Sequence, residues 1–327
     1  MAGLARTNGA RSRGLDRPRR ADCGGERNHA GIRAQLASVA FSKPADVGGD
    51  CNRNMNTQTP FPRIFAKIYG EPWCILPVNH AAIRFAFGKH CLPDGAQADA
   101  VEGGGDEGHA NPQPFFANGI AVVPVHGLIG KHLSLLEMAC GGVDVDAVAA
   151  AVEAAVADAQ VEKVVLWFNS SGGTVTGVPE AAQRIAAAAK IKPVIAFTDS
   201  ICASAAYWLA SQCSAIYTTE SATIGSVGVY TALLDESARL EREGVKINAI
   251  SAGEHKLEGA SFRPLADAER ARIQADVDKI YSRFKSAILS VRPSINADAM
   301  QGQCFDGEDA VLNGISDGVV LSISEIL

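Results

Sequence analysis

The sequence predicts an α/β domain with a mainly parallel sheet from residue 119 onward. Strand-like apolar runs alternate there with helix-like runs, which indicates right-handed strand–helix–strand crossovers. The whole chain of 327 residues is 47% hydrophobic and 20% charged, a composition typical of a globular protein with an ample core. No period of about 20–50 residues recurs, so the sequence does not indicate a solenoid.

The predicted elements follow one another at short intervals. The predicted strands are short apolar runs at residues 120–125, 163–168, 193–197, 215–218 and 245–250. The predicted helices cover residues 145–157, 177–190, a run that begins at Ser204, 232–243 and 266–291. Asp144 or Asp146 is the expected cap of the first helix, and Pro293 closes the last one. A terminal strand–helix unit is expected around residues 304–327.

An arm of different composition precedes this domain. Residues 1–56 are rich in Arg, Gly, Asn and Ala and lack apolar periodicity, which predicts a disordered basic arm. Met55 is an alternative start of translation, and we therefore expect residues 1–54 to be an over-extended gene start.

Two further segments separate the arm from the α/β domain. Residues 57–92 are expected to form a short helical segment, with helices near 61–69 and 80–90. Residues 93–118 are rich in Gly, Pro and acidic residues and are predicted to be a linker. The α/β domain then occupies residues 119–327.

Charge is distributed unevenly along the chain, whose formal net charge is −6. Residues 1–56 contain ten Lys/Arg and five Asp/Glu, so the remainder carries a large acidic excess. The acidic body argues against nucleic acid as the main partner. No apolar run approaches the roughly 20 residues that span a bilayer, so we expect no membrane span and no secretory signal.

No metal or cofactor is predicted. The eight cysteines form no Cys-x-x-Cys pair, which indicates reduced thiols with neither a disulfide framework nor a zinc site. The sequence also lacks His-Glu-x-x-His, a Walker A loop, and a Gly-x-Gly-x-x-Gly that opens a helix after a strand. The motifs of metalloproteases, P-loop proteins and Rossmann domains are therefore missing.

Ser204 lies where the strand-like run 193–197, after a tight turn, gives way to a helix. Free N–H groups and the dipole at a helix N-terminus favour negative charge, so this place suits a nucleophile whose reaction forms an oxyanion. It equally suits an ordinary N-cap serine. No Gly-x-Ser-x-Gly surrounds Ser204, which argues against an α/β-hydrolase.

Three further features are candidates for the same site. Gly172 and Gly173 follow the strand 163–168, where paired glycines form either a simple turn or the backbone of an oxyanion hole. Lys256 is a general base only if burial lowers its pKa, and otherwise an ordinary loop lysine. Ser226 is either a turn serine or the residue that orients the lysine. The competing bases are His126, His132 and His255, and since His255 adjoins Lys256, at most one of these two faces the serine.

A series of segments resembles, in order, the signal peptide peptidase A family of serine peptidases, especially its phage and prophage branch of head maturation proteases. The segments are Ile120–Gly127, Phe168–Gly173, Ala203–Tyr207, Thr223–Val229, Gly253–Lys256, Phe262–Leu265, Phe305–Ala310 and Gly314–Asp317. The resemblance covers about residues 119–321. It departs at two places, since the usual Ser-Pro-Gly-Gly is Ser-Ser-Gly-Gly here and the usual Ser-Gly-Gly is Ser-Ala-Ala.

The resemblance implies a ClpP/crotonase-like α/β fold and a Ser–Lys dyad. It implies Ser204 as nucleophile, Lys256 as general base, Ser226 as the lysine-orienting residue, and Gly172, Gly173 and the N–H of Ala205 as the oxyanion hole. The implied function is that of a serine endopeptidase that cleaves scaffold or capsid proteins. It would act as a homo-oligomer in the bacterial cytoplasm or inside the phage procapsid.

Three alternatives stay open. One is a cellular peptidase of the same family that degrades signal peptides, which the lack of an N-terminal transmembrane helix disfavours. Another is a crotonase-like acyl-CoA enzyme, which uses a two-glycine oxyanion hole without a Ser–Lys pair. The third is an inactive capsid-assembly protein.

Overall fold

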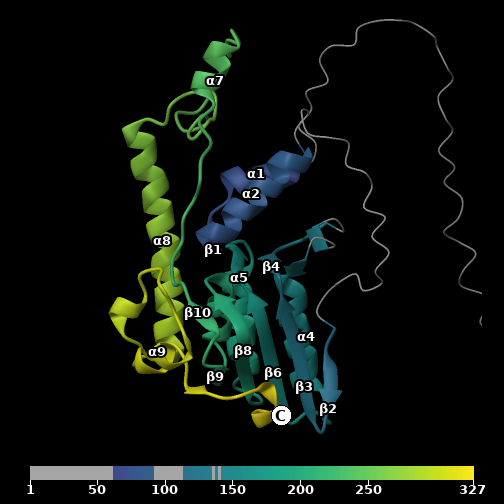
Figure 1. Cartoon of the computed structure of the whole chain (residues 1–327). Coiled ribbons are helices and arrows are strands. Elements are labelled where there is room, and N and C mark those ends of the chain that lie inside the picture. Colours follow the sequence, from purple (N-terminus) through teal and green to yellow (C-terminus); the bar gives the residue numbers. More distant parts are fainter. Residues whose placement is uncertain (1–61, 92–112, 135–136, 139–140) are drawn as a thin grey trace, which may run out of the picture. The chain divides into compact units, whose positions relative to one another are not determined.

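The computed structural model describes residues 62–91, 113–134, 137–138 and 141–327 (Figure 1). The predicted basic arm and most of the predicted linker lie outside these residues. Among the helices that are described, none is both long enough and apolar enough to cross a membrane.

The main sheet has eight strands and a parallel centre. Its parallel strands are β3 (Ile120–His126), β6 (Lys163–Ser170), β8 (Val194–Ala203) and β10 (Thr223–Gly225), in the spatial order β10-β8-β6-β3. The antiparallel strands β11 (Cys304–Phe305) and β2 (Phe115–Ala117) lie at its edges. The strand β9 (Ala215–Thr218) pairs in parallel with both β8 and β12 (Gly318–Val319). The predicted mainly parallel α/β fold is therefore confirmed.

Alternate residues of the strands face two separate apolar cores. Val123 and Leu166 belong to the larger core, which also contains residues of α4 (Val145–Ala157), α5 (Val178–Ala188) and α6 (Ala205–Ala210). Val122 and Val165 belong to the second core, which includes Ile326 near the C-terminus. The ammonium of Lys163 also donates to the carbonyl oxygen of Ile326, and Figure 1 shows the C-terminal residues next to the sheet. Both faces are thus covered, as a parallel sheet requires.

A second, four-stranded sheet joins the N-terminal segment to the domain. Its order is β1 (Trp73–Ile75), β7 (Gly172–Thr174), β4 (Leu128–Gly130) and β5 (Gly142–Asp144). The strand β1 lies in sequence between α1 (Pro62–Gly70) and α2 (Pro77–Cys91), which match the two predicted helices. The segment predicted to be helical at residues 57–92 therefore also contributes a buried strand to the fold.

Several boundaries differ from the predicted ones. The predicted linker extends to residue 118, whereas β2 already pairs with β3 from Phe115. The predicted turn before Ser204 is absent, because β8 continues to Ala203 by pairing with β10. The helix predicted at 232–243 is limited to α7 (Ser237–Arg242).

The predicted strand at 245–250 is wrong. Its alternating apolar side chains are exposed, from 48% for Val245 to 100% for Ile250, and this stretch belongs to none of the strands in the described chain. Apolar alternation indicates a strand only where a neighbouring strand pairs with it, and none does so here.

The long helix predicted at residues 266–291 is α8 (Asp267–Val291), and it packs against α6. The ring of Phe284 on α8 stacks on Trp208 of α6, with 4.3 Å between the ring centroids. Beyond α8, the buried Arg292 pairs with Asp317 through two hydrogen bonds of 3.0 and 2.7 Å. Asp317 also accepts the N–H of Ile216 at 2.7 Å, which ties the C-terminal segment to β9.

We expect Asp317→Ala to lower the free energy of unfolding by on the order of 2 kcal/mol, because Arg292 is left buried without its partner. Burial raises the pKa of Asp317, but the hydrogen bonds and charge of Arg292 outweigh it, so the pKa lies below its usual value. The stabilisation is therefore present above the unfolded pKa of about 3.9 and is lost as the pH falls through the lower folded pKa. Urea denaturation measures both effects.

The matched control is Asp278→Ala on α8, whose carboxylate accepts a hydrogen bond from Gln274 on the exposed surface. We expect this change to cost less than about 0.5 kcal/mol. Equal stability losses in the two variants would contradict the role assigned to the Arg292–Asp317 pair.

Candidate active site

Ser204 occupies the junction between β8 and α6 in a strained backbone conformation. Its φ is 58° and its ψ is −114°, values that residues other than glycine rarely adopt and that cost roughly 1–3 kcal/mol. Among the described residues, its hydroxyl caps no N–H of the helix and instead lies 3.5 Å from the carbonyl oxygen of Gly228. The side chain is therefore not an ordinary helix cap. It is available for other chemistry, although only 1% of the residue is exposed.

Gly172 and Gly173 bring the backbone of β7 against this junction. Gly172 has a φ of 103°, and a Cβ built on it would lie 2.1 Å from the carbonyl oxygen of Cys74 and 3.0 Å from the nitrogen of Ala205. A Cβ on Gly173 would lie 1.8 Å from the carbonyl oxygen of Ile129. Only glycine fits at either position. Gly172 thus lies close to Ala205.

Ser170 holds the glycine loop in position through two hydrogen bonds of its hydroxyl. Its hydroxyl donates to the carbonyl oxygen of Gly127 at 2.6 Å and accepts the N–H of Gly172 at 3.2 Å. The N–H of Gly172 is therefore already engaged, and it would have to change partner to bind an oxyanion. The sequence analysis assigned no role to Ser170, although it directly precedes the Ser-Gly-Gly motif.

Ser226 lies beside Ser204 at the end of the neighbouring strand. Gly225 is paired with Ala203, and the N–H of Ser204 donates to the carbonyl oxygen of Gly225 at 2.8 Å. Ser226 is buried and also has a positive φ, of 55°. Its N–H donates to the carbonyl oxygen of Gln303 at 2.7 Å, and its side chain lies near the thiol of Cys304.

Lys256 lies on the surface, in the segment of turns at residues 252–259. This segment is attached to α8 through Glu258, which pairs with Arg272 and with His255. Within the described part of the chain, no hydrogen bond or ion pair joins Lys256 to Ser204. The structure thus brings together Ser204, Ser226 and the glycine loop and leaves Lys256 exposed.

The three histidines considered as alternative bases each lie in a different environment. His255 is more than half exposed and lies 2.6 Å from Glu258. The ring of His126 stands edge-on to Trp167, with 5.3 Å between centroids. His132 has a positive φ of 52° in the segment that follows β4. In the described residues, no three His, Cys, Asp or Glu side chains gather in a group that could hold a metal ion.

Cys74 is a neighbour of the nucleophile that the sequence analysis missed. This residue of β1 is fully buried, and its thiol lies near the side chain of Ser204. Burial raises the pKa of Cys74 to about 12, although the side chain of Ser204 opposes the shift. The thiol is therefore neutral at physiological pH. No local motif marks Cys74, because the contact depends on the pairing of two distant strands.

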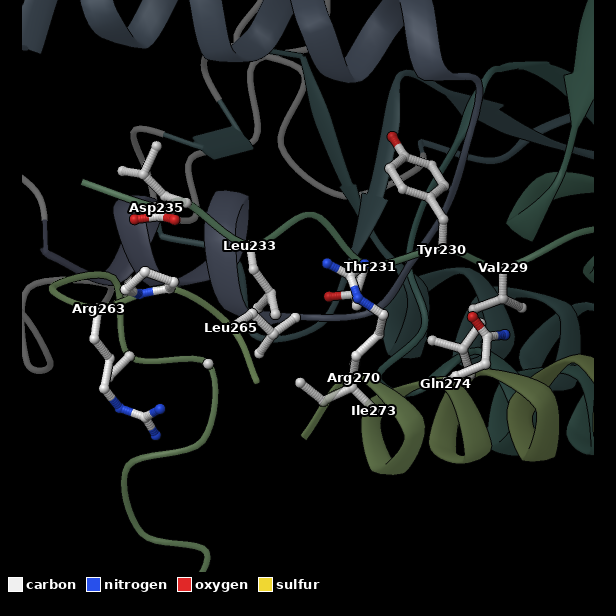
Figure 2. A pocket seen from close by; sticks show the side chains of 15 residues that line it. Val229, Tyr230, Thr231, Leu233, Asp235, Arg263, Leu265, Arg270, Ile273 and Gln274 are labelled. Atoms are coloured by element: carbon white, nitrogen blue, oxygen red, sulfur yellow. The ribbon is translucent and has the colours of Figure 1, made fainter. Parts of the chain in front are cut away.

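A cavity of about 540 Å³ lies next to this region, between the segment 229–235 and the start of α8 (Figure 2). Its walls combine apolar side chains such as Leu233 and Ile273 with the charged Asp235 and Arg270. Figure 2 shows Arg270 extending from α8 towards Thr231. Ser204 does not line this cavity, so the nucleophile candidate is enclosed separately from it.

Comparison with known proteins finds a family model that matches part of this domain. Residues 186–323 match Peptidase family S49. This match confirms the resemblance inferred from the motifs.

Two of the relatives come from phages. The chain is 29% identical to the capsid assembly protease C of Escherichia phage lambda, over 81% of this chain and 64% of that protein. It is 32% identical to the head-tail preconnector protein GP5 of Enterobacteria phage P21, over 62% of this chain and 41% of that protein. The chain therefore spans less than two thirds of the length of either relative. Among solved structures, an enoyl-CoA hydratase from Geobacillus kaustophilus is similar with a TM-score of 0.36 and 14% identity, over 67% of this chain and 74% of that chain.

Gly172→Ala is expected to cost at least about 2 kcal/mol more in unfolding free energy than Gly244→Ala. Both glycines have a positive φ, but a Cβ on Gly244 meets nothing within 4 Å, whereas a Cβ on Gly172 meets Cys74 and Ala205. The comparison thus separates backbone strain from steric exclusion. Chemical denaturation of the two variants measures the difference, and equal losses would show that the approach of β1 to Gly172 is not tight.

Proposed function

We propose, from the premise that residues 186–323 form a Peptidase family S49 domain, that this chain is a serine endopeptidase with Ser204 as its nucleophile. The observation that carries the proposal is the backbone conformation of Ser204 together with its surroundings. This residue is strained, does not cap its helix, and lies against a loop where only glycine fits. Some enzymes hold a nucleophilic serine in a strained conformation at the junction of a strand and a helix.

In the proposed mechanism, neutral Lys256 accepts the proton of the Ser204 hydroxyl as the serine oxygen attacks the peptide carbonyl. Ser226 orients the lysine amine. The N–H groups of Ala205 and of the glycine loop hold the oxyanion, an effect of about 2–4 kcal/mol per donor. The protonated lysine then donates its proton to the leaving amine, and water releases the acyl-enzyme.

The exposure of Lys256 sets a requirement for this mechanism. A solvated ammonium is a poor general base, so the segment 252–259 must be covered before Lys256 can act. We propose that the chain works as a homo-oligomer in which a second copy provides this cover. The exposed apolar side chains of Val245, Ile247 and Ile250, which precede the segment, favour an interface at this face.

The proposed substrates are capsid or scaffold proteins of a phage head. This part of the proposal depends on the two phage relatives, one of which is named as a capsid assembly protease. Mass spectrometry of co-expressed capsid and scaffold proteins would identify the cleavage positions. Fragments that appear equally with and without Ser204 would point to a host protease instead.

Ser204→Ala should reduce peptide cleavage by at least about 1,000-fold, because the reaction loses its nucleophile. The control is Ser200→Ala on the exposed part of β8, which should cleave at the unaltered rate. Circular dichroism would verify that both variants are folded. Turnover of a CoA thioester or of a peptide that survives in Ser204→Ala would contradict the assignment.

Lys256→Ala and Lys256→Arg should both abolish cleavage, since neither side chain can accept a proton near neutral pH. The matched control is Lys246→Ala, which removes another exposed lysine in the same region and should leave the rate within about twofold. The rates are measured on a fluorogenic peptide under identical conditions. Near-normal activity of Lys256→Ala would show that another group is the general base, and His255 is the first candidate.

A further inference from the structure

The strand β1 lies between two stretches of backbone that border Ser204. On one edge it pairs antiparallel with β7, with Cys74 opposite Gly173. On the other edge, the N–H of Trp73 donates to the carbonyl oxygen of Tyr230 at 2.8 Å, and the N–H of Tyr230 donates back to Trp73 at 3.0 Å. A peptide that binds to a sheet edge by strand addition makes main-chain hydrogen bonds of this kind.

Backbone hydrogen bonds extend this pairing beyond the three strand residues. The N–H of Val175 donates to the carbonyl oxygen of Pro72 at 3.2 Å, and the N–H of Leu76 donates to that of Ser171 at 3.2 Å. Residues 72–76 therefore follow the glycine loop along its whole length. The proline at 77 further favours an extended backbone at Leu76.

The side chain of Cys74 closes the site from this strand. It lies near Ser204, and both residues are almost completely buried. The carbonyl oxygen of Cys74 lies against Gly172, in the loop assigned to the oxyanion hole. Because only 1% of Ser204 is exposed, its hydroxyl is not accessible to a substrate carbonyl in this arrangement.

We infer that β1 occupies the edge of β7 to which an extended substrate segment would otherwise bind. The inference rests on the proposed function of Ser204. It implies that substrates bind as extended, uncharged segments antiparallel to β7, with a small side chain where Cys74 lies. It also implies that β1 must leave this edge before a protein substrate is cleaved.

Trp73 is the main anchor of β1. Its indole N–H donates to the carbonyl oxygen of Lys67 at 3.0 Å, and its ring lies 4.9 Å from that of His80. A ring nitrogen of His80 in turn lies 3.0 Å from the carbonyl oxygen of Ile68. The helices α1 and α2 thus hold β1 through one buried aromatic side chain, so this side chain controls its release.

The first test measures how fast a fluorophosphonate probe labels Ser204 in the full chain. Trp73→Ala should be labelled at least about tenfold faster than the unaltered chain, because β1 leaves the site more often. The matched control is Phe197→Ala, which removes a buried aromatic side chain from the second core, away from β1. It should be labelled at the unaltered rate. Equal labelling of Trp73→Ala and the unaltered chain would overturn the inference.

A peptide competition tests the substrate class. A synthetic peptide with the sequence of residues 71–77 should slow the labelling of Trp73→Ala in proportion to its concentration. Replacing its cysteine by alanine should preserve the competition, whereas replacing it by glutamate should abolish it, since a charge would be buried beside Ser204. Equal competition by all three peptides would contradict the predicted preference.

A second measurement uses the unaltered chain, in case Trp73→Ala does not fold. Prolonged treatment with a bulky maleimide modifies Cys74 only when β1 is released, and the modified strand cannot return. Chains modified at Cys74, identified by mass spectrometry, should therefore be labelled at Ser204 at least about tenfold faster. Cys74→Ser should show no such effect of the maleimide. Unchanged labelling after modification would overturn the inference, whereas failure to label Ser204 in any of these chains would instead refute its role as nucleophile.

Discussion

The close approach of backbone to backbone at Gly172 and Gly173 is the constraint on which the rest of the site depends. A side chain at the first position would overlap Cys74, and one at the second would overlap Ile129. Because neither position carries a Cβ, β7 can lie between β1 and β4 and still contact the turn at Ser204. The same two residues therefore join the N-terminal strand to the domain, and Gly172 brings its backbone close to Ala205, next to Ser204.

Packing in the C-terminal half sustains the strain at this site. Ser204 and Ser226 both have a positive φ, at the ends of two paired parallel strands. Such conformations persist only where the surrounding packing and hydrogen bonds hold the backbone in place. Here the fully buried helix α6 provides that restraint, through the stacking of Trp208 on Phe284 and the hydrogen bond of 3.0 Å from Tyr207 to Ile315. The long helix α8 thus serves the geometry of a site to which it contributes no proposed catalytic group.

Sequence periodicity predicted the parallel sheet and the long helices, because their apolar residues recur over many turns or pairings. Local motifs drew attention to Ser204, Ser226 and the glycine pair, whose catalytic roles stay predictions. Cys74 could not be predicted, since a strand of three residues has no measurable period and its contact with Ser204 is non-local. The apolar alternation at 245–250 was misleading for the opposite reason, because a strand requires a partner edge that lies outside its own sequence.

Ser204 and Lys256 pose opposite physical requirements. The buried serine must become accessible to a peptide, whereas the exposed lysine must be shielded from water before it can accept a proton. A substrate strand that replaced β1 would regain the same backbone hydrogen bonds on both edges. The side chains would therefore determine whether β1 or the substrate strand occupies the site. Trp73 buries a large apolar surface that an incoming segment has to match. The replacement of β1 would then select which segments reach Ser204 before any chemistry occurs. The cover over Lys256 would determine whether the chemistry follows.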